Sequence, residues 1–347
     1  LENDLFHMFK IAILACDNGY GHLKRCLLIA YYLSSQGISV DLYGDSSGFK
    51  IAKNIEFNHK KKPTLIPWNF SYDIKYFLSN DCKSFKVLDK LPQLSKYDLV
   101  LSDNIIEVLL KRKDTILISQ FFWHEVLKDI DEEYKNECRK IINSYKPLIF
   151  GDKYFSMKYI KDNLNFLPTG IFTSNYDCST TDNIYDKKRS LLITGGNTNQ
   201  SYKILKETIE IVEKNYFNFI DKIFIDENII PQNHSLKIMK FDYTNAQFNE
   251  IIACICRPGI GIISDCIKHN IRIFTAHEEN NLEMIHNSEI INNMRIGENL
   301  DIENLSSMKK YFNSKLSILK NKQICSSIDL NGVNHIYKFL KENIMRN

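Results

Sequence analysis

Two glycines and a histidine stand together in the segment Gly19-Tyr20-Gly21-His22. Residues 9–15 (FKIAILA) before it form an apolar run typical of a short β-strand, and the glycines mark a turn. Glycine lets the backbone turn close to a ligand, and a helix that begins here offers free N–H groups. Histidine can accept a proton near neutral pH, so His22 is a candidate general base. The alternative is that His22 only caps the helix or faces solvent.

A second glycine-rich turn occurs in residues 256–267 (CRPGIGIISDCI), where an apolar run ends and a helical pattern begins. Its glycines allow close approach of a ligand, its arginine supplies a bidentate cation, and its serine supplies a hydroxyl. The residues expected to contact a phosphate group are Arg257, Gly259, Ile260, Gly261 and Ser264. The alternative is that the Pro-Gly pair only ends a strand and starts a helix.

Other polar residues and glycines follow predicted strands, where a parallel sheet presents its ligand crevice. They are Gly195, Gly196 and Asn197 after one strand, Glu278, Asn281 and Glu283 after another, and Asp103 and His124 in the first half. Carboxylate and amide groups can hydrogen-bond to the hydroxyl groups of a sugar or ribose. Asp103 and His124 are candidate catalytic residues of the first half. Each group also has a structural alternative as a turn, a helix cap or, around Trp123, core packing.

Alternating strand and helix patterns position these groups. The expected strands cover residues 9–15, 38–43, 99–101, 115–119, 148–150, 190–194, 222–225, 236–241, 253–256 and 271–274. The expected helices cover residues 22–33, 133–144, 202–214, 245–252, 260–269, 282–293, 303–319 and 334–343. Strands that alternate with helices predict parallel sheets, so each half of the chain is expected to be a Rossmann-like α/β domain.

The length of 347 residues favours two hydrophobic cores. We expect residues 1–7 to be tag or linker sequence, and residues 8–174 and 190–330 to form the N-terminal and C-terminal Rossmann-like domains. The polar residues 175–189 between them fit a linker. Residues 331–347 are expected to form a helix that crosses back to the first domain.

Composition narrows the function classes. The chain is 44% hydrophobic and 25% charged with a net charge of +3, and it has no dense basic run, which argues against nucleic acid as a partner. No apolar stretch is long enough to span a membrane, so we predict a cytoplasmic protein and leave peripheral membrane contact open. Nine cysteines without CxxC spacing are expected to be reduced and packed. The sequence shows no HExxH or Asp-x-Asp metal motif at a strand end, so we predict no metal ion.

Residues 19–43 (GYGHLKRCLLIAYYLSSQGISVDLY) resemble the first motif of GT-B glycosyltransferases. They are also similar to nucleotide-sugar hydrolases of the pseudaminic acid pathway, in which the histidine of G-x-G-H serves as a base. Residues 256–267 are similar to the GT-B element that holds the diphosphate of a sugar donor. The resemblance implies two Rossmann-like domains with parallel sheets that face each other across a cleft. It makes residues 8–174 the acceptor domain, with Asp103 and His124 on the acceptor side, and residues 190–330 the nucleotide-sugar-binding domain.

The resemblance also implies an activity. It predicts a metal-independent, inverting glycosyltransferase that moves a sugar from a UDP-linked donor to a glycan or glycolipid acceptor, in the synthesis of surface polysaccharide or glycoconjugate, with no cofactor. Hydrolysis of a nucleotide-sugar by the same histidine is the first alternative, favoured by the G-x-G-H-x-x-R-C pattern. A nucleotide-sugar-binding subunit without catalysis is the second.

Overall fold

The structure is a computed structural model whose contacts divide the chain into two compact units. The described residues are 9–17, 19–50, 61–68, 72, 74–174, 190–195, 206, 210, 220, 222–225, 237–277, 281–300, 306–312 and 314–345. The first unit comprises Leu1–Asn175 and Asn331–Asn347, and the second comprises Tyr176–Leu330. The expected linker at 175–189, the leading residues 1–7 and most of the expected helix at 202–214 lie outside the described residues.

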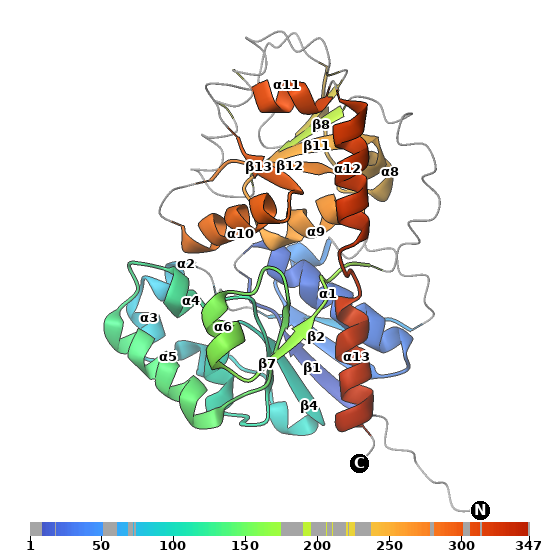
Figure 1. Cartoon of the computed structure of the whole chain (residues 1–347). Helices are drawn as coiled ribbons and strands as arrows, with labels where there is room; N and C mark the ends of the chain where they lie inside the picture. Colours follow the sequence, from blue (N-terminus) through green and yellow to red (C-terminus); the bar gives the residue numbers. More distant parts are fainter. Residues whose placement is uncertain are drawn as a thin grey trace, which may run out of the picture. The chain divides into compact units, whose positions relative to one another are not determined.

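A seven-stranded parallel sheet forms the centre of the first unit (Figure 1). Its strands are β1 (Lys10–Leu14), β2 (Ser39–Gly44), β3 (Thr64–Pro67), β4 (Leu99–Asp103), β5 (Ile116–Ile118), β6 (Ile149–Asp152) and β7 (Phe166–Thr169). Their order across the sheet is β3-β2-β1-β4-β5-β6-β7. The order reverses between β1 and β4, and ligands of open α/β sheets bind beyond the strand ends at such a point.

Alternate side chains of β1 point into two separate cores of the first unit. Ile11 and Ile13 belong to the cluster that includes residues of α1 (Tyr20–Ser35) and α13 (Gly332–Asn343), whereas Ala12 and Leu14 belong to the cluster on the other face. The other helices of this unit are α2 (Ile74–Phe77), α3 (Asn80–Lys83), the 3₁₀ helices η2 (Lys86–Asp89), η3 (Leu94–Lys96) and η4 (Ile106–Leu110), and α4 (Trp123–Val126), α5 (Glu132–Tyr145) and α6 (Lys158–Asn163). The C-terminal helix α13 therefore completes a core of the first unit.

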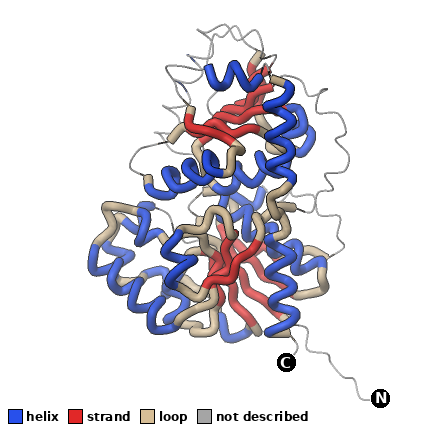
Figure 2. Tube along the Cα trace, viewed as in Figure 1, coloured by secondary structure: helices blue, strands red, loops and turns tan. Residues whose placement is uncertain are grey.

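A six-stranded parallel sheet forms the centre of the second unit (Figure 2). Its strands are β8 (Ser190–Thr194), β9 (Lys222–Ile225), β10 (Ile238–Lys240), β11 (Ile251–Cys256), β12 (Arg272–Thr275) and β13 (Gly297–Asn299). Their order is β10-β9-β8-β11-β12-β13, so this sheet reverses between β8 and β11. The two sheets thus repeat one strand order, and the predicted α/β class with parallel sheets is confirmed.

The described helices of the second unit are α8 (Asn245–Glu250), α9 (Ile260–Lys268), α10 (Leu282–Asn293), α11 (Ser306–Phe312) and α12 (Lys315–Ser326). The prediction of one helix over residues 303–319 is wrong, because α11 and α12 are separate helices. The side chain of Ser314 accepts a hydrogen bond from the backbone N–H of Ser317 at 3.1 Å, which caps α12 and starts it anew.

Two further findings concern the cysteines and the lengths of the helices. The eight cysteines within the described residues are all buried, and none of these eight forms a disulfide. Among the described helices, none is both long enough and apolar enough to cross a bilayer.

Candidate active site

His22 lies in the first turn of α1, directly after the carboxyl end of β1. Gly19 precedes the helix with a φ of 92°, a left-handed conformation that favours glycine over any residue with a Cβ. No side chain caps α1 and no acidic residue occupies its first turn. The glycine turn therefore places the imidazole at the strand-end edge of the sheet, where only 9% of the surface of His22 is exposed.

Asp103 is the residue that His22 contacts. The Nδ1 atom of His22 lies 2.7 Å from Oδ1 of Asp103, the last residue of β4, whose side chain is fully buried. The two residues are far apart in sequence but meet because β1 and β4 are neighbours in the sheet. An Nδ1–H that donates to the carboxylate leaves the lone pair of the imidazole on Nε2. The pair thus has the arrangement of a general base with an orienting carboxylate.

Arg25 completes this pair and was missing from the residues singled out in the sequence. Its Nε donates to Oδ2 of Asp103 at 3.0 Å, and its Nη2 donates to Oδ1 at 2.8 Å. The thiol of Cys26 donates to the same Oδ2 at 3.3 Å. The only available signal was the spacing H-x-x-R, which places two side chains on one face of a helix.

Charge inside this cluster keeps Asp103 ionised. Burial alone would raise the pKa of Asp103, but the Arg25 guanidinium and the hydrogen bonds from Arg25 and His22 lower it to about 2. Burial likewise tends to lower the pKa of Arg25, and its pairing with Asp103 raises it instead. Near neutral pH the carboxylate and the guanidinium therefore form a compensated buried ion pair.

Two aromatic rings flank the imidazole. The ring of Phe121 meets His22 edge-on with centroids 6.0 Å apart, and the ring of Trp123 lies 5.5 Å away at a tilt of 44°. Both aromatic side chains are buried. They restrict the orientation of the His22 ring.

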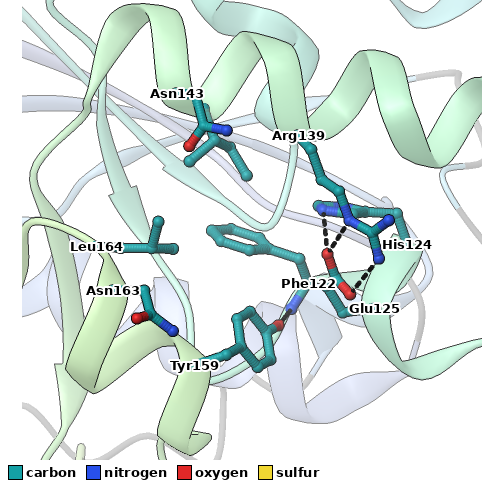
Figure 3. A pocket seen from close by; sticks show the side chains of 9 residues that line it. Phe122, His124, Glu125, Arg139, Asn143, Tyr159, Asn163 and Leu164 are labelled. Atoms are coloured by element: carbon teal, nitrogen blue, oxygen red, sulfur yellow. Dashed lines mark hydrogen bonds and ion pairs between the residues drawn. The ribbon is translucent and has the colours of Figure 1, made fainter.

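His124 belongs to a different cluster, as Figure 3 shows. Its ring stacks on Phe122 at 5.6 Å, and its Nε2 lies 3.4 Å from Glu125, which binds Arg139 through two contacts of 2.7 and 2.8 Å. This cluster borders a pocket of about 270 Å³ that is also lined by Ile142, Asn143, Tyr159, Asn163 and Leu164. Burial lowers the pKa of His124. The structure thus brings Asp103 to His22 but gives no contact between His124 and that pair.

The glycine-rich turn of the second unit leads into α9, which begins after Gly259. No side chain caps this helix, and its first turn has no acidic residue. No atom of the described residues lies within 4 Å of the point that a Cβ on Gly259 would occupy. The buried side chain of Asn287 donates to the carbonyl of Pro258 at 2.8 Å and holds the turn from behind. The N–H groups at Ile260 and Gly261 begin an uncapped helix, which favours an anion.

The remaining candidates of the second unit have mixed placements. Arg257 directly follows β11 and is half-buried, and Gly195 follows β8 and is buried. The hydroxyl of Ser264 donates to the carbonyl of Ile260 at 2.6 Å, so the expected donation to a phosphate is not the bond it makes. Asn281 caps α10 by accepting from the N–H of Met284 at 3.2 Å, and Glu283 lies in the first turn of that helix. Gly196, Asn197 and Glu278 lie outside the described residues.

Neither a protein-family model nor a curated protein sequence matches the chain. Solved structures match it over nearly its whole length. The spinosyn rhamnosyltransferase SpnG superimposes with a TM-score of 0.65 at 10% identity, over 97% of this chain and 100% of that one. The glycotransferase of kitacinnamycin gives 0.63 at 11% identity (96% and 99%), and MurG of Acinetobacter baumannii gives 0.57 at 12% identity (96% and 99%). The chain has the GT-B fold.

In this GT-B fold each candidate cluster lies at the switch point of its own sheet. His22 and Asp103 follow β1 and β4, the pair at which the first sheet reverses. Gly195 and Arg257 follow β8 and β11, the pair at which the second sheet reverses. Strand-end crevices at switch points are where open α/β sheets bind ligands, so both clusters are candidate ligand sites. The similarity to hydrolases of the pseudaminic acid pathway stays a prediction.

The low pKa of Asp103 predicts acid-sensitive stability of this GT-B chain. The folded-state pKa is about 2 and an aspartate in an unfolded chain has a pKa of about 3.9. The group therefore contributes about 2 to 3 kcal/mol above pH 5, and about half of this is lost as the pH falls to 3. Urea unfolding between pH 3 and 6 should show the stability advantage of wild type over Asp103→Asn shrinking by about 1 kcal/mol.

Asp152 is a second buried carboxyl group, and because burial raises its pKa, its contribution to stability has the opposite pH dependence. The difference between wild type and Asp103→Asn is therefore needed to isolate the contribution of Asp103. Asp114→Asn is the comparison variant. This exposed carboxyl pairs with Arg112, which lowers its pKa too, so its advantage should shrink in the same direction but by less than that of Asp103. An advantage of wild type over Asp103→Asn that stays constant from pH 6 to 3 would contradict the assignment.

Proposed function

We propose that the chain is a glycosyltransferase that moves a sugar from a nucleotide-sugar donor to a hydroxyl group of an acceptor. The observation that carries the proposal is the buried contact of 2.7 Å between His22 and Asp103 at the switch point of the first sheet. The GT-B fold supports it, since SpnG, the glycotransferase of kitacinnamycin and the calicheamicin glycosyltransferase CalG4, which all match, are sugar transferases by name.

In the proposed reaction Nε2 of His22 accepts the proton of the acceptor hydroxyl. The acceptor oxygen forms a bond to the anomeric carbon, and the bond from that carbon to the donor phosphate breaks with its electron pair on the nucleoside diphosphate. The imidazolium that results is stabilised by the Asp103 carboxylate at Nδ1. A single displacement of this kind inverts the anomeric configuration.

The departing diphosphate is proposed to bind at the turn before α9. The backbone N–H groups of Ile260 and Gly261 and the positive end of the α9 dipole would face the phosphate oxygens, with Arg257 as the cation. Gly259 leaves open space beside these groups. These cationic and N–H groups act in place of a metal ion in the proposed mechanism.

Nucleotide binding is the first test of the proposal. We predict saturable binding of UDP in isothermal titration, at least tenfold tighter than that of CMP, GDP or free uridine. UDP is the nucleotide expected from the sequence, and thymidine diphosphate, present in a structure of SpnG, is the closest chemical competitor. Absence of saturable binding to every nucleotide and nucleotide-sugar in this panel would refute the proposal.

Acceptor dependence separates transfer from hydrolysis. The His22–Asp103 pair is equally suited to activate water, so a hydrolase remains the second candidate on the same observation. A transferase should consume the donor at least tenfold faster when an acceptor glycan or glycolipid is supplied. Donor turnover that does not depend on acceptor would assign the hydrolase. As part of the transferase proposal, the enzyme acts in the cytoplasm or at a membrane surface, and its product is used in the synthesis of surface polysaccharide or glycoconjugate.

A further inference from the structure

Arg25 lies in a buried chain of hydrogen bonds behind His22. Its Nη1 donates to the side-chain oxygen of Gln120, and Nε2 of Gln120 donates to Oδ2 of Asp152 at 2.7 Å. The other oxygen of Asp152 accepts from the backbone N–H of Phe155 at 2.6 Å. Arg25 is only 4% exposed, and Asp152 is fully buried. The guanidinium is therefore held in place from β6 while it grips Asp103 at the end of β4.

The contact with Asp103, which Arg25 holds in place, decides which nitrogen of His22 carries the proton. Nη2 of Arg25 lies 2.8 Å from Oδ1 of Asp103 and 3.2 Å from Nδ1 of His22. A contact of 2.7 Å between Nδ1 and a carboxylate oxygen requires a hydrogen between them, because two lone pairs would repel. The guanidinium carries only donors, and its Nη2, like the Nδ1–H of His22, donates to Oδ1 of Asp103. The neutral ring is therefore the Nδ1–H tautomer, with Nε2 free to accept a proton.

Arg25 also balances the charge that His22 meets. The ionisable groups linked to the ring by hydrogen bonds are Asp103 from β4, Arg25 and Cys26 from α1, and, through Gln120, Asp152 from β6. The helix α4, which packs on the ring through Trp123, also carries His124 and Glu125. Without the guanidinium, His22 would face a buried carboxylate whose charge nothing compensates. Such a carboxylate favours the imidazolium, which has no lone pair for an incoming proton.

We infer that Arg25 is a positioning residue that fixes the Nδ1–H tautomer of His22 and keeps the ring neutral by compensating Asp103. Its catalytic consequence rests on the proposed function, but the tautomer and charge of His22 do not. The pair His22–Asp103 is thus part of a chain of five hydrogen-bonded residues, His22–Asp103–Arg25–Gln120–Asp152.

Nitrogen NMR of the full chain labelled with ¹⁵N-histidine tests the inference without any substrate. The chain has nine histidines, and a His22→Asn variant identifies the signals of His22. In wild type we expect Nδ1 of His22 to be protonated and Nε2 to be bare at pH 8. In Arg25→Gln the midpoint of the ring titration should move upward by about one pH unit or more. Arg25→Lys keeps the positive charge but loses the paired N–H donors that hold both oxygens of Asp103. The midpoint of the His22 titration should therefore stay within about half a pH unit of wild type, while both neutral tautomers of the ring become populated.

Arg112 supplies the matched control. It is another arginine of the first unit that bonds backbone carbonyls and an aspartate, here Asp114, and no contact links it to His22. Arg112→Gln and Arg112→Lys should leave the His22 signals unchanged, and circular dichroism should show that each variant is folded.

Two results would overturn the inference. One is a wild-type His22 that carries its proton on Nε2, which needs no variant to detect. The other is a folded Arg25→Gln whose His22 titration and tautomer equal those of Arg112→Gln. Neither result depends on nucleotide binding or sugar transfer, so failure of the inference and failure of the proposed function are distinguishable.

Discussion

His22→Ala is expected to lower kcat for sugar transfer by about 10²- to 10⁴-fold, the usual contribution of a general base. The reason is geometric: Nε2 is the atom of the His22–Asp103 pair left to accept the acceptor proton, and alanine removes it. UDP affinity should change less than about twofold, because the proposed phosphate contacts come from the turn before α9. Initial rates with donor and acceptor measure kcat, and isothermal titration measures the affinity for UDP.

Two histidines make this measurement specific. His335→Ala is the control, because that ring lies on α13 and accepts a hydrogen bond from the backbone N–H of Gly170, and kcat should stay within about twofold. His124→Ala tests the predicted acceptor-side role separately, and we expect less than a tenfold loss, since the ring packs on Phe122 and Glu125. A His22→Ala enzyme with the activity of His335→Ala would remove the base from the mechanism.

The interior strands of both sheets were predictable and several edge strands were not. Interior parallel strands are apolar on both faces, so runs such as residues 190–194 and 222–225 match β8 and β9. The sequence analysis omitted β3, β7 and β13, which are edge strands. Pro67 and Pro168 interrupt the strand pattern of β3 and β7, and an edge tolerates them because one side needs no ladder bond. The short β13 (GEN) has no apolar run at all.

Local patterns located the candidate residues of the site, but topology decides which of them meet. His22 and Gly259 stand in glycine turns that are visible in the sequence. Asp103 reaches His22 only because β4 pairs with β1, an order that strand patterns do not reveal. The hydroxyl of Ser264 donates to the carbonyl of Ile260, a bond that serine can make inside a helix to the residue four positions earlier, and its predicted phosphate contact stays a prediction.

Gly259→Asp should weaken UDP binding by about 30-fold, or about 2 kcal/mol, while the chain stays folded. Gly259 has φ −73° and ψ 144°, a conformation open to any L-residue, and a Cβ there meets nothing within 4 Å. Aspartate is also a preferred residue at the N-cap of a helix, so the melting temperature should not fall. The new carboxylate would bond the N–H groups of the first turn of α9 and would repel a diphosphate placed there.

Gly259→Ser separates charge from bulk. Serine is also a good N-cap, but it is neutral, and we expect it to lower UDP affinity less than about fivefold. Isothermal titration of UDP and thermal unfolding should be recorded for both variants. If Gly259→Asp is folded and binds UDP as wild type does, the diphosphate does not bind at this helix start. If Gly259→Ser loses as much affinity as Gly259→Asp, the turn acts through its shape, and the anion preference of α9 does not explain binding.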